Sequence, residues 1–120
     1  MTEYAILLTG DEDRWAKATE EQRAVTFARH DEFTKALADR GHVVTGGAEL
    51  AHSRGTKVVR GSRGAVSVTD GPYAEAAEQL GGFYLVRTDD LDDLLGVCGI
   101  LADGDGAIEV RVCLPGPDAE

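Results

Sequence analysis

Cysteine, proline and tryptophan are scarce in this chain of 120 residues, which has two cysteines, three prolines and one tryptophan. Cys98 and Cys113 lie far apart in the sequence, each within an apolar run, so we expect buried thiols rather than a disulfide framework or redox chemistry. No run approaches the roughly 20 apolar residues that a membrane-spanning helix needs, and residues 1–3 lead straight into a predicted strand rather than a basic leader. A soluble cytoplasmic protein is therefore expected.

Basic residues are also few relative to acidic ones. Twelve Lys and Arg stand against 22 Asp and Glu, a net charge of −10, which repels a phosphate backbone and makes DNA or RNA an unsuitable partner. The three histidines and two cysteines show no metal-ligand spacing, and the run 103–106 is shorter than a calcium loop. No nucleophile elbow or cofactor fingerprint is visible, so neither a metal nor a cofactor is expected.

The hydrophobic fraction of 42% suits one globular domain, which we place at residues 1–114, with a flexible tail at 115–120. Alternating apolar residues predict a first strand over residues 4–9. Thr19 and Gln22 have the spacing of a capping box, and Gly41 is a typical stop, so a long helix is expected from Thr19 to Arg40. Further strands are predicted at 43–45, 82–87 and 108–112, and a β-hairpin at 56–69 turns through the glycine-containing run 61–64.

The order of these elements predicts the fold class. With the hairpin removed, they read βαββαβ, an α+β ferredoxin-like unit in which both helices cover one face of the sheet. The strand at 108–112 alternates apolar and charged residues, and the helices leave the other sheet face without a cover. We expect a second copy to cover that face, which makes the protein a homodimer.

Each helix has a predicted apolar stripe. In the first helix the stripe consists of Phe27, His30, Phe33 and Leu37, which recur at steps of three and four. The second helix is expected to be capped by Thr88 or Asp89. Its stripe is predicted to consist of Leu91, Leu94, Leu95, Cys98 and Leu101.

Two neighbouring segments carry the most distinctive motif of the chain: Asp70-Gly71-Pro72-Tyr73-Ala74-Glu75 and Glu78-Gln79-Leu80-Gly81-Gly82-Phe83-Tyr84. Together they predict a tight turn, a short acidic helix and the start of a strand. Asp70 itself has two interpretations, a turn and cap residue or a member of a site on a rigid turn.

This motif resembles that of the DGPF subgroup of the YCII-related family. The resemblance extends to the first strand, to Trp15 in the loop after it and to the start of the long helix, although Tyr73 stands where the subgroup usually has Phe. It implies a dimeric α+β barrel with two sheets face to face. It also implies a pocket with a histidine and an aspartate, and a functional link to an extracytoplasmic-function sigma factor.

His30 is the strongest candidate for chemistry. An imidazole on the apolar face of a helix needs a hydrogen-bond partner. One interpretation is a core histidine satisfied by a backbone carbonyl or a tyrosine hydroxyl. The other is a catalytic pair in which Asp70 orients His30 as a general base, and the resemblance favours this pair. His42 is expected at the surface or a strand edge without a partner, whereas His52 lies in a loop and is a candidate ligand contact.

The remaining candidates for ligand binding are Arg14, Trp15, Tyr73 and Glu75. Arg14 and Trp15 could offer a cation and an aromatic wall to a small anionic or carbonyl-bearing ligand, and Trp15 could equally fill the packing. Glu75 and Glu78 would share one helix face, where a solvated acidic surface is the plain interpretation.

Two functions follow from these residues. The first is a small lyase-like or isomerase-like enzyme that uses His30 and Asp70, with Tyr73 or Arg14 holding a substrate oxygen. The second is a non-catalytic ligand-binding or regulatory module connected with sigma-factor signalling. The fold class does not choose between them.

Overall fold

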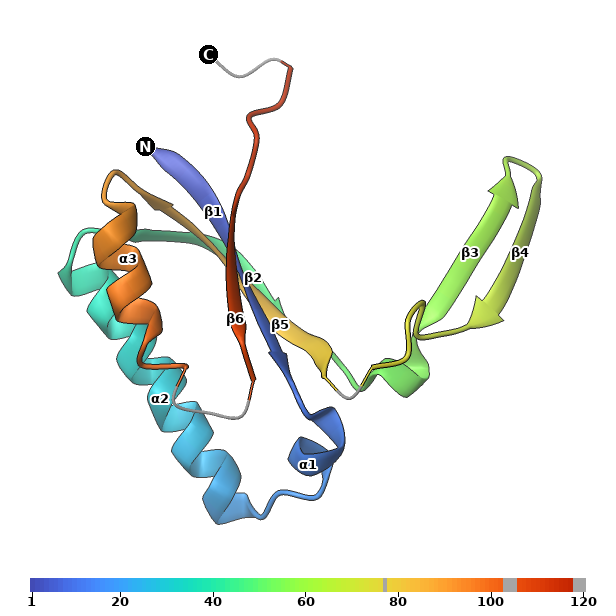
Figure 1. The fold of residues 1–120 in the computed structure, drawn as a ribbon, viewed down its shortest axis with the longest axis horizontal. Helices are drawn as coiled ribbons and strands as arrows, with labels where there is room; N and C mark the ends of the chain where they lie inside the picture. The colour runs from blue at the N-terminus through green and yellow to red at the C-terminus, as the bar shows by residue number, and fades with distance from the viewer. Residues whose placement is uncertain (77, 103–105, 118–120) are drawn as a thin grey trace.

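The structure of the protein is a computed structural model that describes residues 1–76, 78–102 and 106–117. Figure 1 shows one sheet with helices on one side and a separate hairpin on the other. In chain order the elements are β1 (Thr2–Gly10), α1 (Glu12–Ala16), α2 (Glu20–Asp39), β2 (Val43–Glu49), the 3-10 helix η1 (Ser53–Gly55), β3 (Lys57–Ser62), β4 (Ala65–Asp70), β5 (Gln79–Thr88), α3 (Leu91–Cys98) and β6 (Ile108–Val112).

The main sheet has four strands in the order β2-β5-β1-β6, and every neighbouring pair is antiparallel. This order, with α2 after β1 and α3 after β5, is consistent with a ferredoxin-like α+β unit. β3 and β4 pair with each other in a second, two-stranded sheet. The mixed α+β class predicted from the sequence is confirmed.

The long helix begins and ends where its signals predict. The Thr19 hydroxyl accepts from the Gln22 amide, while the Gln22 side chain accepts from the Thr19 amide, so the capping box is complete. After the helix, Gly41 adopts a φ of 83°, a conformation that favours glycine. Phe33 is fully buried, as expected, but Phe27 is 50% exposed and does not belong to the core. The reason is that Phe27 lies on α2 beside a cavity and contacts Trp15 there.

Helix α3, the second helix that the sequence predicts, starts one or two residues later than expected from a cap at Thr88 or Asp89. Its N-cap is Asp90, whose carboxylate accepts from the Asp93 amide, whereas Thr88 accepts from the Asp90 amide just before the helix. Leu94 and Cys98 of the predicted stripe are buried, and so is Val97, whereas Leu91 and Leu95 are exposed. These three buried residues of α3 belong to the core cluster that also contains Phe33 and Leu37 of α2.

Two local predictions were wrong. The loop after β1 contains the short helix α1, because the Asp11 carboxylate caps it by accepting from the Arg14 amide. The expected acidic helix after Pro72 is not formed in the described residues 72–76 and 78, which have no regular structure. Residues 103–105 of the run that was compared with a calcium loop, and residues 118–120 of the expected tail, lie outside the described residues.

The core lies between the helices and one face of the sheet. Tyr4 and Ile6 of β1 and Val86 of β5 come from the sheet, and they meet Phe33 and Leu37 of α2. Leu94, Val97 and Cys98 of α3 complete the cluster. Both cysteines are free thiols, and burial raises the pKa of the Cys98 thiol.

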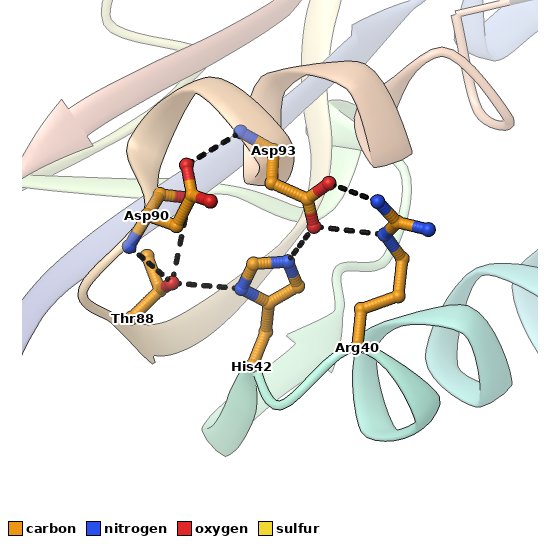
Figure 2. A network of polar contacts seen from close by, with 5 residues as sticks. All are labelled: Arg40, His42, Thr88, Asp90 and Asp93. Carbon is orange, nitrogen blue, oxygen red and sulfur yellow. Dashed lines mark hydrogen bonds and ion pairs between the residues drawn. The ribbon is translucent and has the colours of Figure 1, made fainter.

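A polar junction, formed by Arg40, His42, Thr88 and Asp93, ties the end of α2 to the start of α3 (Figure 2). The Arg40 guanidinium donates to both carboxylate oxygens of Asp93, and His42 Nε2 donates to Asp93 Oδ2 at 2.7 Å. On its other side, His42 Nδ1 lies 2.7 Å from the Thr88 hydroxyl. His42 was expected at the surface or a strand edge without a partner; it does directly precede the edge strand β2, but it is buried and has two partners. Only 3% of the residue is exposed, because the turn after α2 directs it beneath α3.

The same junction lowers the pKa of the Asp93 carboxyl well below its usual range, through the hydrogen bond from Arg40 first and that from His42 second. A carboxyl whose pKa is lower in the folded state stabilises the fold above its ordinary pKa near 3.8. This contribution declines as the pH falls below that value.

We expect His42→Ala to lower the free energy of unfolding by about 2–3 kcal/mol, because it leaves a void and removes partners from Thr88 and Asp93. Urea unfolding at fixed protein concentration measures the change. His52→Ala, which removes a histidine from the rim of the molecule, is the control and should cost less. Equal stability of the two variants would show that the junction does not hold the helices.

Candidate functional site

The larger cavity of the protein lies where α1 and α2 meet the ends of β1, β2 and β5, and its volume is about 690 Å³. Its wall includes the aromatic residues Trp15, Phe27 and Tyr84, together with Leu50 and His30. A mostly apolar wall with a few polar groups is typical of a site for a small molecule.

The aromatic wall is held in place by an arginine. The rings of Trp15 and Phe27 meet edge to face with centroids 5.7 Å apart. The Arg23 guanidinium stacks 5.1 Å from the Trp15 ring and donates to the Trp15 carbonyl at 3.0 Å. Arg23 also donates to the Ala16 carbonyl, so this side chain of α2 joins the end of α1 to the long helix.

The polar centre of the cavity is a pair formed by His30 and Tyr84. His30 Nδ1 lies 2.7 Å from the Tyr84 hydroxyl, and the Tyr84 ring also packs on Phe33. Burial lowers the pKa of His30, although Glu49 and Asp31 oppose this effect. Burial also raises the pKa of Tyr84. At neutral pH the pair therefore consists of an uncharged imidazole and an un-ionised phenol.

Such a pair has two hydrogen-bonded forms. When the Tyr84 hydroxyl donates to Nδ1, the Nε2 atom of His30 carries the ring proton and can donate a hydrogen bond to a ligand. When Nδ1 carries the proton and donates to Tyr84, Nε2 is a free base that can take a proton from a ligand and later return it. Hydrogen-bond donation and proton acceptance are thus both available at one atom.

The rim of the cavity is fastened by polar contacts between α1 and the residues around η1. The Glu12 carboxylate accepts from the Ser53 amide at 2.9 Å and from the Ser53 hydroxyl. His52 Nε2 lies 2.8 Å from Asp13 Oδ1, and this hydrogen bond lowers the pKa of Asp13. His52 Nδ1 accepts from the Arg54 amide, which leaves the proton on Nε2 for Asp13.

A second cavity of about 500 Å³ adjoins the first and shares His30 and Trp15 with it. Arg14 of α1 and Arg29 of α2 line this second cavity together with Asp11, so its lining carries a net positive charge. His30 therefore faces an apolar space on one side and a more basic one on the other.

The structure brings together only some of the residues that the sequence singled out. His30, Trp15 and His52 line the larger cavity, and Arg14 lines the smaller one. Asp70, Tyr73, Glu75 and Glu78 line neither, and all four are exposed.

The suggested pair of His30 and Asp70 is not formed. Asp70 ends β4 in the hairpin, where its carboxylate accepts from Lys57 Nζ at 2.5 Å. Tyr73, 79% exposed, lies beneath the Arg60 guanidinium. The observed partner of His30 is a tyrosine hydroxyl, which was the other interpretation of this residue.

Sequence reasoning did not single out Tyr84, Phe27, Arg23 or Glu49 as site residues. Alternation in β5 was the available signal for Tyr84, because Tyr84, Val86 and Thr88 share the face toward the helices. No comparable signal existed for Arg23, whose role depends on the placement of α1.

Comparison with known proteins agrees with this architecture, because the model of the YCII-related domain matches residues 2–99. The chain belongs to the YCII-related domain family. It is also 32% identical over 114 residues to an uncharacterized protein of Rhizobium meliloti (strain 1021), an alignment that covers 90% of this chain and 89% of that protein. The YCII-related resemblance found in the sequence is confirmed, and the DGPF subgroup stays a prediction.

No helix in the described part of this YCII-related chain is long and apolar enough to cross a membrane.

We expect the pKa of His30, followed by NMR of the imidazole, to lie below 6.5, because the buried ring resists a charge. Since the folded state then binds fewer protons than the unfolded state, stability falls as the pH drops below 6.5. Tyr84→Phe keeps the burial and removes the hydroxyl. It should leave the pKa low but change the ¹⁵N signals that report the tautomer. A His30 pKa above 6.5 would contradict this account.

Proposed function

We propose that this protein binds a small, mainly apolar molecule in the larger cavity and that His30 exchanges a proton with it. The observation that carries the proposal is the uncharged His30 in hydrogen-bond contact with Tyr84 within an aromatic wall. A general base works best when it is uncharged at the working pH and held by a second group. Tyr84 takes the orienting role that the sequence suggested for Asp70.

The charges around the cavity favour an uncharged ligand. Asp11, Glu12 and Glu49 line it against the single positive charge of Arg23 among the described lining residues. Arg23 donates through Nη2 to two backbone carbonyls, while its buried Nε has no hydrogen-bond partner among the described residues. An anion would meet net repulsion there. A neutral molecule with a carbonyl oxygen suits both the apolar wall and the hydrogen-bonding pair, which supports a lyase-like or isomerase-like proton transfer.

A non-catalytic binding module is the second candidate, because the hydrogen bond to Tyr84 also satisfies a histidine that has only a structural role. In this case the cavity captures a small molecule and passes on a signal. The link to a sigma factor belongs to this candidate and rests on the resemblance to the DGPF subgroup alone.

We expect cyclohexanone, a neutral apolar ketone, to change the fluorescence of Trp15, which is the only tryptophan of the chain and lies in the cavity wall. The protein should also speed the exchange of the ketone's α-hydrogens for deuterium in D₂O, followed by proton NMR. His30→Gln should slow this exchange about 100-fold or more, because it removes the base. Asp70→Asn is the control and should keep the wild-type rate.

The outcomes of this experiment separate the two candidates. A fluorescence change without exchange in the wild type supports the binding module and contradicts catalysis by this pair. Loss of exchange in Asp70→Asn would restore the pairing that the sequence suggested. No fluorescence response to the ketone would count against the cavity as a site for neutral carbonyl compounds.

A homodimer is the second part of the proposal, and it rests on the sheet face that carries no helix. The strand register places six apolar residues on this face, namely Ala5, Leu7, Val43, Ala48, Phe83 and Leu85. Charged residues flank them, including Glu3 and Arg87, whose Oε2 and Nε atoms lie 3.6 Å apart. An apolar centre with a charged rim is typical of a protein interface. Two such faces packed together make the dimeric α+β barrel that the resemblance implies.

We expect Leu85→Glu to convert a dimer into a monomer in sedimentation equilibrium at micromolar concentration, because it places a charge in the apolar centre. Leu95→Glu is the matched control, since Leu95 lies on α3 and is already 46% exposed. It should leave the dimer intact. A monomeric wild type under these conditions would contradict the proposal.

A further inference from the structure

The hairpin of β3 and β4, residues 57–70, projects from the body of the protein as an arm. Figure 1 shows it on the side of the sheet opposite α2 and α3, separated from the strands of the main sheet. β3 and β4 pair with each other and with no other strand among the described residues. A single two-stranded hairpin is at best marginally stable in water. The arm therefore lacks support from the rest of its own chain.

The arm has one apolar face. Its register pairs Val59 with Val68 and Gly61 with Val66, so the three valines point to the same side. They are 57–61% exposed. The opposite side presents Arg60 and Ser67, which also form a cross-strand pair. Alternation of this kind is typical of a strand pair with one covered face, yet in the single chain the valine face is open.

The size of the molecule indicates that a substantial cover is missing. The accessible surface is 8448 Å², whereas a compact chain of 12.7 kDa exposes about 6,200 Å². The radius of gyration is 16.6 Å, against about 14 Å for a compact domain of this length. The excess of roughly 2,000 Å² per chain is in the range that a stable dimer of two such chains buries.

We propose that the arm packs its valine face against a second copy of this chain and so clasps the partner across the dimer. This inference rests on the proposed homodimer and adds a second contact region to its sheet face. The arm lies on the side of the uncovered sheet face (Figure 1). A partner whose sheet packs on that face therefore lies on the same side of the molecule as the arm. Two-fold symmetry then lets the arm of each subunit contact the other subunit in the same way.

Charge supports a second copy as the occupant. The arm carries Lys57, Arg60 and Arg63 against one carboxylate, that of Asp70, and is therefore basic, with a net charge of +2. The whole chain has a net charge of −10, so the rest of it is strongly acidic. A basic arm is attracted to the acidic body of another copy, and this attraction guides two chains into contact.

The test uses the full chain with Val59→Thr and Val68→Thr together. Threonine keeps the β-branched shape and favours the hairpin, but its hydroxyl weakens apolar packing. Since a dimer contains four altered positions, the dissociation constant measured by sedimentation equilibrium should rise about tenfold or more. Ser67→Thr, on the opposite side of the same hairpin, is the control and should stay within about twofold of the wild type.

Hydrogen exchange gives a second measurement. A change confined to the hairpin of one chain would not make amide exchange depend on protein concentration. In the wild type, backbone amides of residues 57–70 should exchange more slowly above the dissociation constant than below it. In the double variant this dependence on protein concentration should shift to higher concentration.

The outcomes separate the arm from the rest of the proposal. The sheet dimer stands if the wild type dimerises and Leu85→Glu abolishes the dimer. The arm inference is overturned if, in addition, Val59→Thr/Val68→Thr has the same dissociation constant as Ser67→Thr and the hydrogen exchange of residues 57–70 does not depend on protein concentration. If the wild type is a monomer at all micromolar concentrations, both are overturned. The ketone experiment on the cavity is independent of either result.

Discussion

The position of α2 over β5 is the constraint on which the rest of the structure depends. Both ends of this contact use polar side chains from one face of β5. Thr88 meets His42 just after the helix, and Tyr84 meets His30 about three turns earlier on it. Phe33 and Leu37 are fully buried between these two contacts, so apolar packing and hydrogen bonds fix the helix in the same register. A rotation or shift of α2 would separate the candidate catalytic pair.

The two ends of this contact have different chemical roles because their surroundings differ. At the end of α2, Arg40 and Asp93 supply opposite charges, and the network closes on itself between two helices. At the other end, His30 and Tyr84 have no ion-pair partner in the part of the chain that the structure describes, and burial favours the uncharged form of both. A cavity opens beside them because α1, fastened to α2 by Arg23 and to η1 by Glu12, stands off from the sheet.

In a single chain, the side of the sheet away from the helices has apolar surface that no other described element covers. The sheet face without helices and the valine face of the arm both carry exposed or half-buried apolar side chains, and no other element among the described residues covers either face. The strand register says which side chains share a face, but not which partner covers them. The proposed second copy would account for both open faces together, because both lie on the same side of the molecule (Figure 1).

Local signals in the sequence were sufficient wherever one short segment decides its own conformation. The capping box at Thr19, the glycine stop at Gly41 and the alternation in β6 each predicted their element, because hydrogen bonds and side-chain periodicity act over a few residues. The order of the elements then led to the α+β class, and the motifs led to the YCII-related family.

The pairing of distant side chains was decided by the tertiary structure alone. His30 lies 54 positions from Tyr84, and His42 lies 51 positions from Asp93. No local pattern says which of several candidates the packing will bring within hydrogen-bond distance. For that reason the sequence allowed Asp70 as a partner for His30, whereas in the structure Asp70 lies in the arm and pairs with Lys57. The sequence by itself determined the elements, their order and the family, because these depend on short-range interactions and composition. Only the packing of α1 and α2 on the sheet decided where the cavity lies and which groups meet in it.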